Sequence, residues 1–381
     1  MDNLTHSLVG LGLSKAGLER VSPYATTVCL LSANAADADF VALFFGDRWT
    51  LLHHHRGITH SVIGTIAVGI LVPLLVAAIG KIIARIRGHG STIRLPGLML
   101  ASLIAAATHP LMDWTNNYGI RPLLPWSGRW FYGDLVYIVD PYIWLLLGGV
   151  TFLLTSRGRW RLAAWAALGT LTTALIFLAS IRGGADASAL KVVPLIWIAG
   201  LIIIVAARVS GFGKWVGSNT ALTALAIVVL YWCGLTAAHR QAYAASVATA
   251  EKLALSNNEN VVKVAAMPTI ANPFQWESVA ETDRAVYRYV TSIPDVEGRD
   301  ARGSARRFEK PNGRAAQLVA NAEQDRRVRE FMLFARFPIA VPASSDCIGQ
   351  TLVQFADLRY TEPGAARGTF SVNVPVDCPA R

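Results

Sequence analysis

The chain has 381 residues, of which 53% are hydrophobic and only 16% are charged, and its mean hydropathy is +0.40. This composition excludes an ordinary soluble enzyme. The net charge is +10, and most of the basic excess lies before residue 237, where Lys and Arg are expected to flank membrane segments. Because no basic patch with interleaved aromatic residues is present, we expect no nucleic-acid partner.

Apolar runs dominate the first part of the chain. Residues 6–19 and 24–37 form a short pair that predicts a helical hairpin dipping into the membrane. Six longer runs, each near the length needed to span a bilayer, follow. They cover residues 62–80, 96–112, 135–154, 162–180, 192–207 and 219–237. The predicted fold is an all-α polytopic membrane bundle with about eight membrane segments, in a membrane domain of residues 1–237 whose site-bearing core is residues 1–150.

Residues 238–381 are more polar and predict a small, mainly β extramembrane domain. A helix is expected near 239–255. Short β-like runs, separated by turn residues, are expected at 259–265, 285–291, 329–339 and 351–358. Residues 296–314 read as a long exposed loop. A disulfide between Cys347 and Cys378 would imply an oxidising compartment, and the sequence leaves it open.

The loops predict the orientation in the membrane. Eleven Lys and Arg residues fall on the side of loops 81–95, 155–161 and 208–218, against six on the other side. The richer side is expected to be cytoplasmic, so both termini and the tail would face outward from a bacterial inner membrane. This topology was built from the apolar runs and from Lys and Arg alone. In it, the aspartates and histidines of the candidate site also fall at or near the outward ends of the apolar runs.

Two of the polar groups lie near the start of the chain. His6 taken alone is an ordinary surface histidine. Asp37 and Asp39 follow an apolar helix at a spacing that does not share one helical face, so a helix end is expected there. A solvated helix terminus explains them as well as a metal site does, although carboxylates bridge cations in two-metal sites.

The segment from His53 to Ser61 contains three consecutive histidines and a fourth at His60, directly before a spanning run. Imidazole is a common ligand of transition metals, so His55 and His60 are candidates. Arg56 is suited to hold a phosphate or to orient a carboxylate. A Ser/His/Asp catalytic triad could be built with Ser61 as the nucleophile, but it would account for only one of the aspartates in these motifs.

His109 and Asp113 are separated by four residues, so one helical face presents both, as in helices that offer two ligands to a metal. An ion pair between them explains the spacing equally well. Asp140 lies inside an apolar stretch and needs a partner, which a metal, a ligating His or Arg121 would supply. The aromatic residues from Trp126 to Tyr132 are typical of an interfacial belt.

These motifs resemble the membrane-bound metal-dependent hydrolases known as YdjM-like proteins. The resemblance covers about residues 1–150 and rests on Met1-Asp2-x-x-Thr5-His6, Asp37-x-Asp39, His55-Arg56-Gly57-Ile58-Thr59-His60-Ser61, His109-x-x-x-Asp113, Asn116-x-Tyr118-Gly119, Arg121-Pro122 and Asp140-Pro141. It implies metal-dependent hydrolysis and a distant similarity to zinc-dependent phospholipases C and single-strand nucleases. Those enzymes use a free N-terminal residue as a ligand. That role is not carried over here, because Met1 precedes His6.

We therefore predict a metal-dependent hydrolase, with a phosphoester of a phospholipid or a lipid-linked phosphate as substrate. The expected ligands of two or three divalent ions, with zinc favoured, are His6, Asp37, Asp39, His55, His60, His109, Asp113 and Asp140. Asp39 or Asp134 would accept the proton, and Arg56 and Arg121 would hold the anionic substrate. The alternative is a divalent-metal transporter or metal sensor. A transporter would place its ligands near the bilayer midplane.

Overall fold

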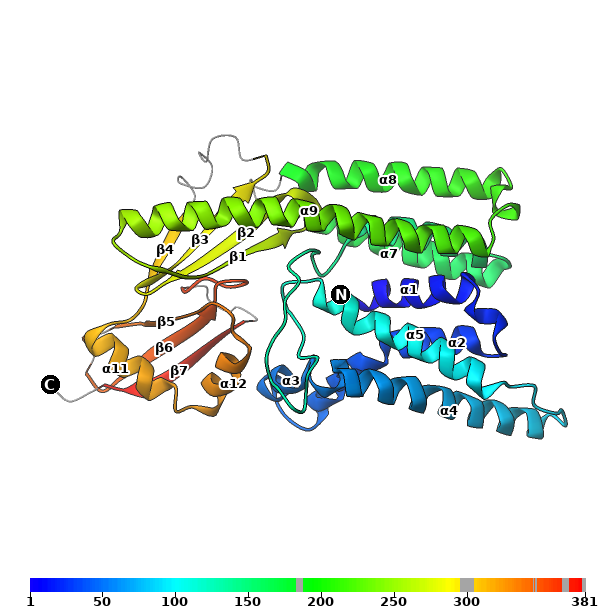
Figure 1. Ribbon diagram of the computed structural model, residues 1–381, viewed down its shortest axis with the longest axis horizontal. Helices are drawn as coiled ribbons and strands as arrows, with labels where there is room; N and C mark the ends of the chain where they lie inside the picture. The colour runs from blue at the N-terminus through cyan, green and yellow to red at the C-terminus, as the bar shows by residue number, and fades with distance from the viewer. Residues whose placement is uncertain (183–187, 295–304, 345, 347, 365–369, 379–381) are drawn as a thin grey trace. The chain divides into compact units, whose positions relative to one another are not determined.

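The computed structural model describes residues 1–182, 188–294, 305–344, 346, 348–364 and 370–378 (Figure 1). The chain divides into two compact units. The first contains residues 1–38, 56–236 and 269–273, and the second contains residues 39–55, 237–268 and 274–381. The boundary predicted near residue 237 thus falls within one long helix, and the segment 39–55 belongs to the second unit.

The first unit is helical, and its N-terminal part packs four helices together. They are α1 (Asn3–Lys15), α2 (Ala25–Asn34), α4 (Val62–Ile86) and α5 (Leu95–Trp114), with short 3-10 turns at Leu18–Arg20 and Ile58–His60. Small residues such as Cys29, Ala33, Ala101 and Ala105 fill the contacts between α2 and α5. Small side chains allow this close approach of helices, which is how membrane helices usually associate.

The remainder of the first unit is built from α6 (Pro141–Thr155), α7 (Arg159–Arg182), α8 (Ser188–Val209), a 3-10 turn at Phe212–Lys214 and the first half of α9 (Ser218–Ser256). In Figure 1, α1 lies between α7 and α9 on one side and α4 and α5 on the other, and α1 contacts α2, α5 and α6.

Six helical segments among the described residues are long and apolar enough to cross a membrane. They are Ala25–Phe44, Val62–Ile86, Leu95–Trp114, Arg159–Ile181, Val192–Val209 and Ser218–Ser256. Large apolar side chains along α4, including Ile66, Leu71 and Leu75, are exposed, as expected of a lipid-facing surface. The predicted polytopic α-helical membrane bundle is confirmed.

Two predicted segments differ in length. The run 135–154 is an apolar helix only from Pro141 to Thr155, because Asp140 caps it and Pro141 occupies its first position. The segment expected at 24–37 is longer, since α2 continues into a 3-10 stretch, η2 (Ala35–Phe44).

The second unit contains the C-terminal half of α9, a short helix α3 (Arg48–His54) and two sheets. The first sheet has the order β1 (Val261–Thr269), β2 (Asn272–Thr282), β3 (Ala285–Ser292) and β4 (Arg306–Glu309). β2 and β3 pair antiparallel, with Ser278 opposite Tyr289. Ala242 and Ser246 of α9 contact this sheet, where Ser246 Oγ lies 2.7 Å from Ser278 Oγ.

The second sheet has the order β5 (Pro338–Pro342), β6 (Gln350–Asp357) and β7 (Ser371–Asp377), all antiparallel. The helices α11 (Gly313–Ala322) and α12 (Arg326–Phe334) pack on it through Leu318, Phe331 and Phe355. The predicted β-rich C-terminal domain is therefore confirmed.

The expected β run 329–339 is wrong over its first half, where α12 forms instead. Val328, Phe331 and Phe334 are spaced three residues apart and bury one helical face, and Asp325 caps the helix. Residues 296–304 of the expected loop 296–314 lie outside the described residues, and the remainder contains β4 and the start of α11. Cys378 is disulfide-bonded, and Cys347 lies outside the described residues.

Candidate metal centre

The candidate centre forms where four helices of the first unit present alternate ends at one place. His6 lies in the first turns of α1, Asp37 follows the C-terminal end of α2, and His60 immediately precedes α4. His109 and Asp113 lie in the last turns of α5. Because consecutive helices run in opposite directions, these ends meet on one side of the bundle. The structure thus brings together five of the eight predicted metal ligands.

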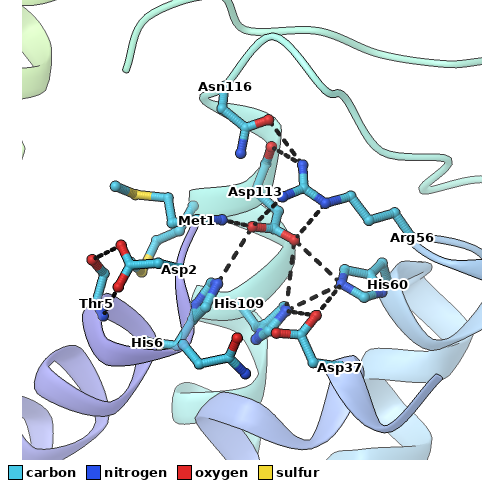
Figure 2. Close-up of polar contacts among 12 residues, drawn as sticks. Met1, Asp2, Thr5, His6, Asp37, Arg56, His60, His109, Asp113 and Asn116 are labelled. Carbon is cyan, nitrogen blue, oxygen red and sulfur yellow. Dashed lines mark hydrogen bonds and ion pairs between the residues drawn. The ribbon is translucent and has the colours of Figure 1, made fainter. Parts of the chain in front are cut away.

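Four of these residues form a compact group of metal-ligand type. Asp37, His60, His109 and Asp113 each offer one ligand atom, and these atoms all lie within 4.8 Å of one another. His60 Nε2 lies 3.4 Å from Asp37 Oδ1 and 3.2 Å from Asp113 Oδ2. His109 Nε2 lies 3.5 Å and 3.6 Å from the same two oxygens. Figure 2 shows the Asp113 carboxylate at the middle of the cluster.

The tautomer of His109 is set by its backbone partner. Nδ1 lies 2.6 Å from the carbonyl oxygen of Ala33, which only accepts, so Nδ1 carries the hydrogen. In the neutral ring, Nε2 then presents a lone pair toward the cluster, where His60 Nε2 lies 3.1 Å away. A backbone carbonyl that holds one ring nitrogen so that the other faces a metal is the usual arrangement of a ligating histidine.

His6 completes the cluster from α1. Its ring stacks on His109 with centroids 3.7 Å apart, and Nε2 lies 3.3 Å from Asp113 Oδ1. The side chain is fully buried, yet neither ring nitrogen makes a hydrogen bond within the part of the chain that the structure describes. Buried polar atoms are nearly always satisfied, so a ligand is expected here.

Arg56 is committed to Asp113. Its Nε lies 3.1 Å from Asp113 Oδ2, Nη2 donates to Asp113 Oδ1 at 3.2 Å, and Nη1 donates to Asn116 Oδ1 at 2.8 Å. The guanidinium also covers the Tyr118 ring at 4.5 Å. Its backbone has φ of +55°, a strained value for a non-glycine residue. These contacts make Arg56 a positioning residue for Asp113; binding of substrate by Arg56 stays a prediction.

The amino group of Met1 also contacts Asp113, and sequence reasoning did not assign it to the site. Asp2 caps α1 by accepting from Thr5 N at 2.9 Å, and its backbone N donates to Ile138 O. Trp144 Nε1 then donates to Thr5 Oγ1 at 2.9 Å. These contacts anchor the first residues of the chain beside α5 and α6. The Asp2–Thr5 spacing, typical of a helix cap, was the available signal.

Asp39 and His55, two further predicted ligands, belong to the second unit. His55 Nδ1 lies 3.0 Å from Asp39 Oδ1 there, so these two side chains pair with each other. His53 of the same unit lies 2.6 Å from Glu330 Oε2. The cluster described above is built from the first unit alone.

The loop between α5 and α6 carries the remaining predicted catalytic residues. Arg121 is buried, and its guanidinium lies 4.8 Å from the centre of the Trp130 ring. Asp134 is also buried, with φ of +53°. Its neighbours Gly133 and Leu135 donate backbone hydrogen bonds to the end of α5, which fixes Asp134 near that helix terminus.

Asp140, a predicted metal ligand, and Ser61, the residue of the alternative catalytic triad, both take part in local structure. Asp140 accepts from Tyr142 N at 2.8 Å and Ile143 N at 3.1 Å, and Tyr231 Oη donates to its other oxygen at 2.9 Å. The partner that the buried Asp140 needs is therefore a helix end and a tyrosine. Ser61 caps α4 by accepting from Gly64 N and donates to Ile58 O, so its hydroxyl is engaged in local structure.

The donor set fits a divalent transition metal. Imidazole nitrogens and carboxylate oxygens are the ligands that zinc and related ions take in catalytic sites. The buried nitrogens of His6 and the facing Nε2 atoms of His60 and His109 are groups that a bound cation would satisfy. The four grouped residues are nearly inaccessible except for Asp37, whose side chain is 10% exposed.

Comparisons with known proteins agree with this architecture. The chain is 23% identical over 152 residues to the uncharacterised protein YfhP of Bacillus subtilis (strain 168). The matched region covers 38% of this chain and 43% of that relative. No solved structure matches the chain. The model of the YdjM inner membrane protein family matches residues 1–185, the part that contains the whole cluster. Over these residues the chain is similar to the YdjM inner membrane protein family.

Proposed function

We propose that the protein is a membrane-bound metal-dependent hydrolase that cleaves a phosphoester of a lipid or lipid-linked substrate. The observation that carries the proposal is the fixed tautomer of His109, whose Nε2 lone pair faces His60 Nε2 and two carboxylates in a buried cluster. Zinc, in two or three ions, is the metal we favour.

We assign a role to each residue of the cluster from the contacts that it makes. His60, His109, Asp37 and Asp113 would hold the metal, with His6 as a further ligand. A divalent ion bound there supplies Lewis-acid chemistry, since it polarises a phosphoryl oxygen and acidifies water. Arg56 orients the Asp113 carboxylate. Asp134 is our candidate for the proton acceptor, and Arg121 for the group that binds the anionic substrate.

The location of the cluster supports a lipid substrate. His60, His109 and Asp113 lie at or near the ends of α4 and α5, which are long and apolar enough to cross a membrane, and this supports a cluster near headgroup depth. Trp126 on the neighbouring loop is 74% exposed, as in interfacial belts. The disulfide-bonded Cys378 and the distribution of Lys and Arg support an outward-facing C-terminal domain.

Metal content and turnover test the proposal. The protein is purified in detergent, bound metals are counted by mass spectrometry, and wild type is compared with His60→Ala and His109→Ala. His89→Ala is the matched control, because His89 is exposed in the loop after α4. We expect at least tenfold lower metal occupancy and loss of phosphoesterase activity in the first two variants only.

Two outcomes would contradict the proposal in different ways. Equal metal content in all four proteins would show that His60 and His109 do not bind the metal, which contradicts the proposed centre. Full metal content in wild type with no turnover on any phosphoester, with or without lipid chains, would favour a metal transporter or sensor.

A further inference from the structure

An apolar cavity of about 730 Å³ lies among α1, α6, α7 and α8 of the first unit. Leu4 and Leu8 of α1, Gly148 of α6, and Gly169 of α7 are among its lining residues. Its size lies within the roughly 300–1,000 Å³ of small-molecule binding sites. Two of its helices, α7 and α8, are long and apolar enough to cross a membrane, and α6 is a shorter apolar helix, so we expect its surroundings to be lipid.

The polar side chains that line the cavity already have partners. The hydroxyl groups of Thr170, Thr172 and Thr173 donate to carbonyl oxygens one turn earlier in α7. Such bonds leave the methyl groups of the threonines to form the wall. The helix therefore offers the cavity a hydrocarbon surface.

The three lining tryptophans are satisfied in the same way. Trp165 Nε1 donates to Thr155 Oγ1, and Trp197 Nε1 donates to Thr173 Oγ1, each at 2.9 Å. Trp144 Nε1 donates to Thr5 Oγ1 at 2.9 Å. A ligand that needs hydrogen bonds gains nothing from such a wall, whereas a hydrocarbon chain matches it.

The cavity and the metal cluster share α1. Leu4 and Leu8 face the cavity, while His6 between them faces Asp113 and His109. Trp144 joins the two sides, because its ring lines the cavity and its nitrogen bonds Thr5 and Asp2. An elongated amphiphile with its chain in the cavity would thus have its polar end beside the N-terminus of α1.

We propose that this cavity binds a hydrocarbon chain of a membrane lipid and so positions the lipid beside the metal cluster. That this lipid is the substrate rests on the proposed hydrolase function. The chain site itself rests on the cavity, its saturated polar groups and its place within membrane helices.

Gly169→Leu tests the cavity directly. Gly169 lines the cavity, and a Cβ built there meets no atom within 4 Å, so a leucine at this position is expected to occupy part of the cavity. Gly234→Leu is the matched control: Gly234 has the same open surroundings on α9 and does not line the cavity. Each protein is reconstituted in vesicles containing a phospholipid with a photoactivatable group at the end of its acyl chain, and labelled peptides are mapped.

We expect wild type and Gly234→Leu to be labelled mainly in α6, α7 and α8, and Gly169→Leu to lose at least fivefold of that labelling. Equal labelling of the three proteins would overturn the chain site, as would absence of labelling from the cavity helices of wild type. The latter result would instead indicate that a second copy or another helix covers the cavity.

A second readout separates this inference from the proposed function. For a long-chain phosphoester, Gly169→Leu should raise KM at least fivefold, with hydrolysis of a chain-free ester unchanged. If no ester is hydrolysed while labelling is lost only in Gly169→Leu, the proposed function fails and the chain site stands. If hydrolysis of long-chain esters is unaffected by Gly169→Leu, the positioning role is overturned.

Discussion

The Asp113 carboxylate is the common contact of the cluster. It lies on a helix between His6, His60 and His109, and the amino group of Met1 and the guanidinium of Arg56 also contact it. A carboxylate that is 1% exposed requires cationic or hydrogen-bonding partners to stay ionised. Arg56 supplies two of these contacts through its planar fork, which a lysine does not reproduce.

Replacement of Arg56 is therefore expected to destabilise the first unit. Arg56→Met leaves the Asp113 carboxylate without its guanidinium, and breaking a buried pair in this way costs about 3–5 kcal/mol. The loss should be larger after chelation of metal, because a bound cation would partly compensate the carboxylate. Thermal unfolding in detergent, with and without EDTA, measures both effects.

Arg87→Met is the control for this experiment, since Arg87 is exposed at the end of α4. Arg56→Lys should recover only part of the stability. Wild-type melting temperatures for Arg56→Met in both conditions would show that Arg56 does not hold Asp113 in place.

Residue types and spacing were sufficient to predict the five histidines and aspartates that converge in the first unit. They were insufficient for Met1 and for Asp140. The position of the Met1 amine depends on how the chain enters α1, which spacing does not reveal. Asp140 looked like a ligand because it is a carboxylate in an apolar run, but the pair Asp140-Pro141 is also a helix start, and the structure uses it that way.

At the level of elements, the close approach of helices positions the cluster. A Cβ at Gly10 of α1 would lie 2.8 Å from the carbonyl oxygen of Cys29, so only glycine permits this approach of α1 to α2. This contact lies one turn from His6. Small residues within spanning helices were readable in the sequence, but the helix that each one meets was not.

Element boundaries were predictable where one signal dominates. Five of the six long apolar runs gave helices able to span a membrane, because length and hydropathy suffice for them. The run 135–154 gave only the shorter helix Pro141–Thr155, and Ala25–Phe44, expected as half of a short hairpin, is itself long enough to span. Short amphipathic segments failed: α12 has apolar residues three apart and a helix cap, yet its mixture of Phe, Leu and Arg resembles a strand in a short window.

Strand β1 begins next to an ionic network that should make the second unit sensitive to acid. Burial would raise the pKa of Glu259, but hydrogen bonds from Arg307, Thr282 and Tyr287 hold that pKa below its ordinary value. Because the folded pKa is the lower one, this contribution to stability is complete above the unfolded pKa, near about 4.3. It is lost as the pH falls through the folded pKa.

Glu259→Gln should therefore destabilise the second unit at pH 7, and the difference from wild type should shrink as the pH drops below about 4. Hydrogen exchange of peptides from β2 and β3, compared between variant and wild type at each pH, measures this difference. Glu251→Gln on the exposed face of α9 is the control. A difference that is constant from pH 7 to pH 3 would exclude the titration of Glu259 as its cause.

On the scale of the whole molecule, one long helix contributes to both the helical membrane unit and the β-rich unit. α9 runs without interruption for 39 residues from Ser218 to Ser256, so its first half belongs to the first unit and its second half to the second. The composition predicted two parts. It did not reveal that residues 39–55 belong with the C-terminal one, because that association involves packing of Trp49 on residues almost 300 positions away.

The orientation of these parts across the membrane is a prediction that cysteine labelling can measure. The excess of Lys and Arg in loops such as 81–95 predicts that these loops face the cytoplasm, while the loop before α6 and the segment after α9 face outward.

In a Cys233→Ser background, Gly128→Cys and Asn257→Cys should react with a membrane-impermeant maleimide on intact spheroplasts. Ser91→Cys should react only after permeabilisation. All three positions are exposed, and a Cβ at Gly128 meets no atom within 4 Å, so a difference in reactivity reports the side of the membrane and not burial. Labelling of Ser91→Cys in intact spheroplasts, with protection of the other two, would invert the topology and place the candidate metal centre on the cytoplasmic side.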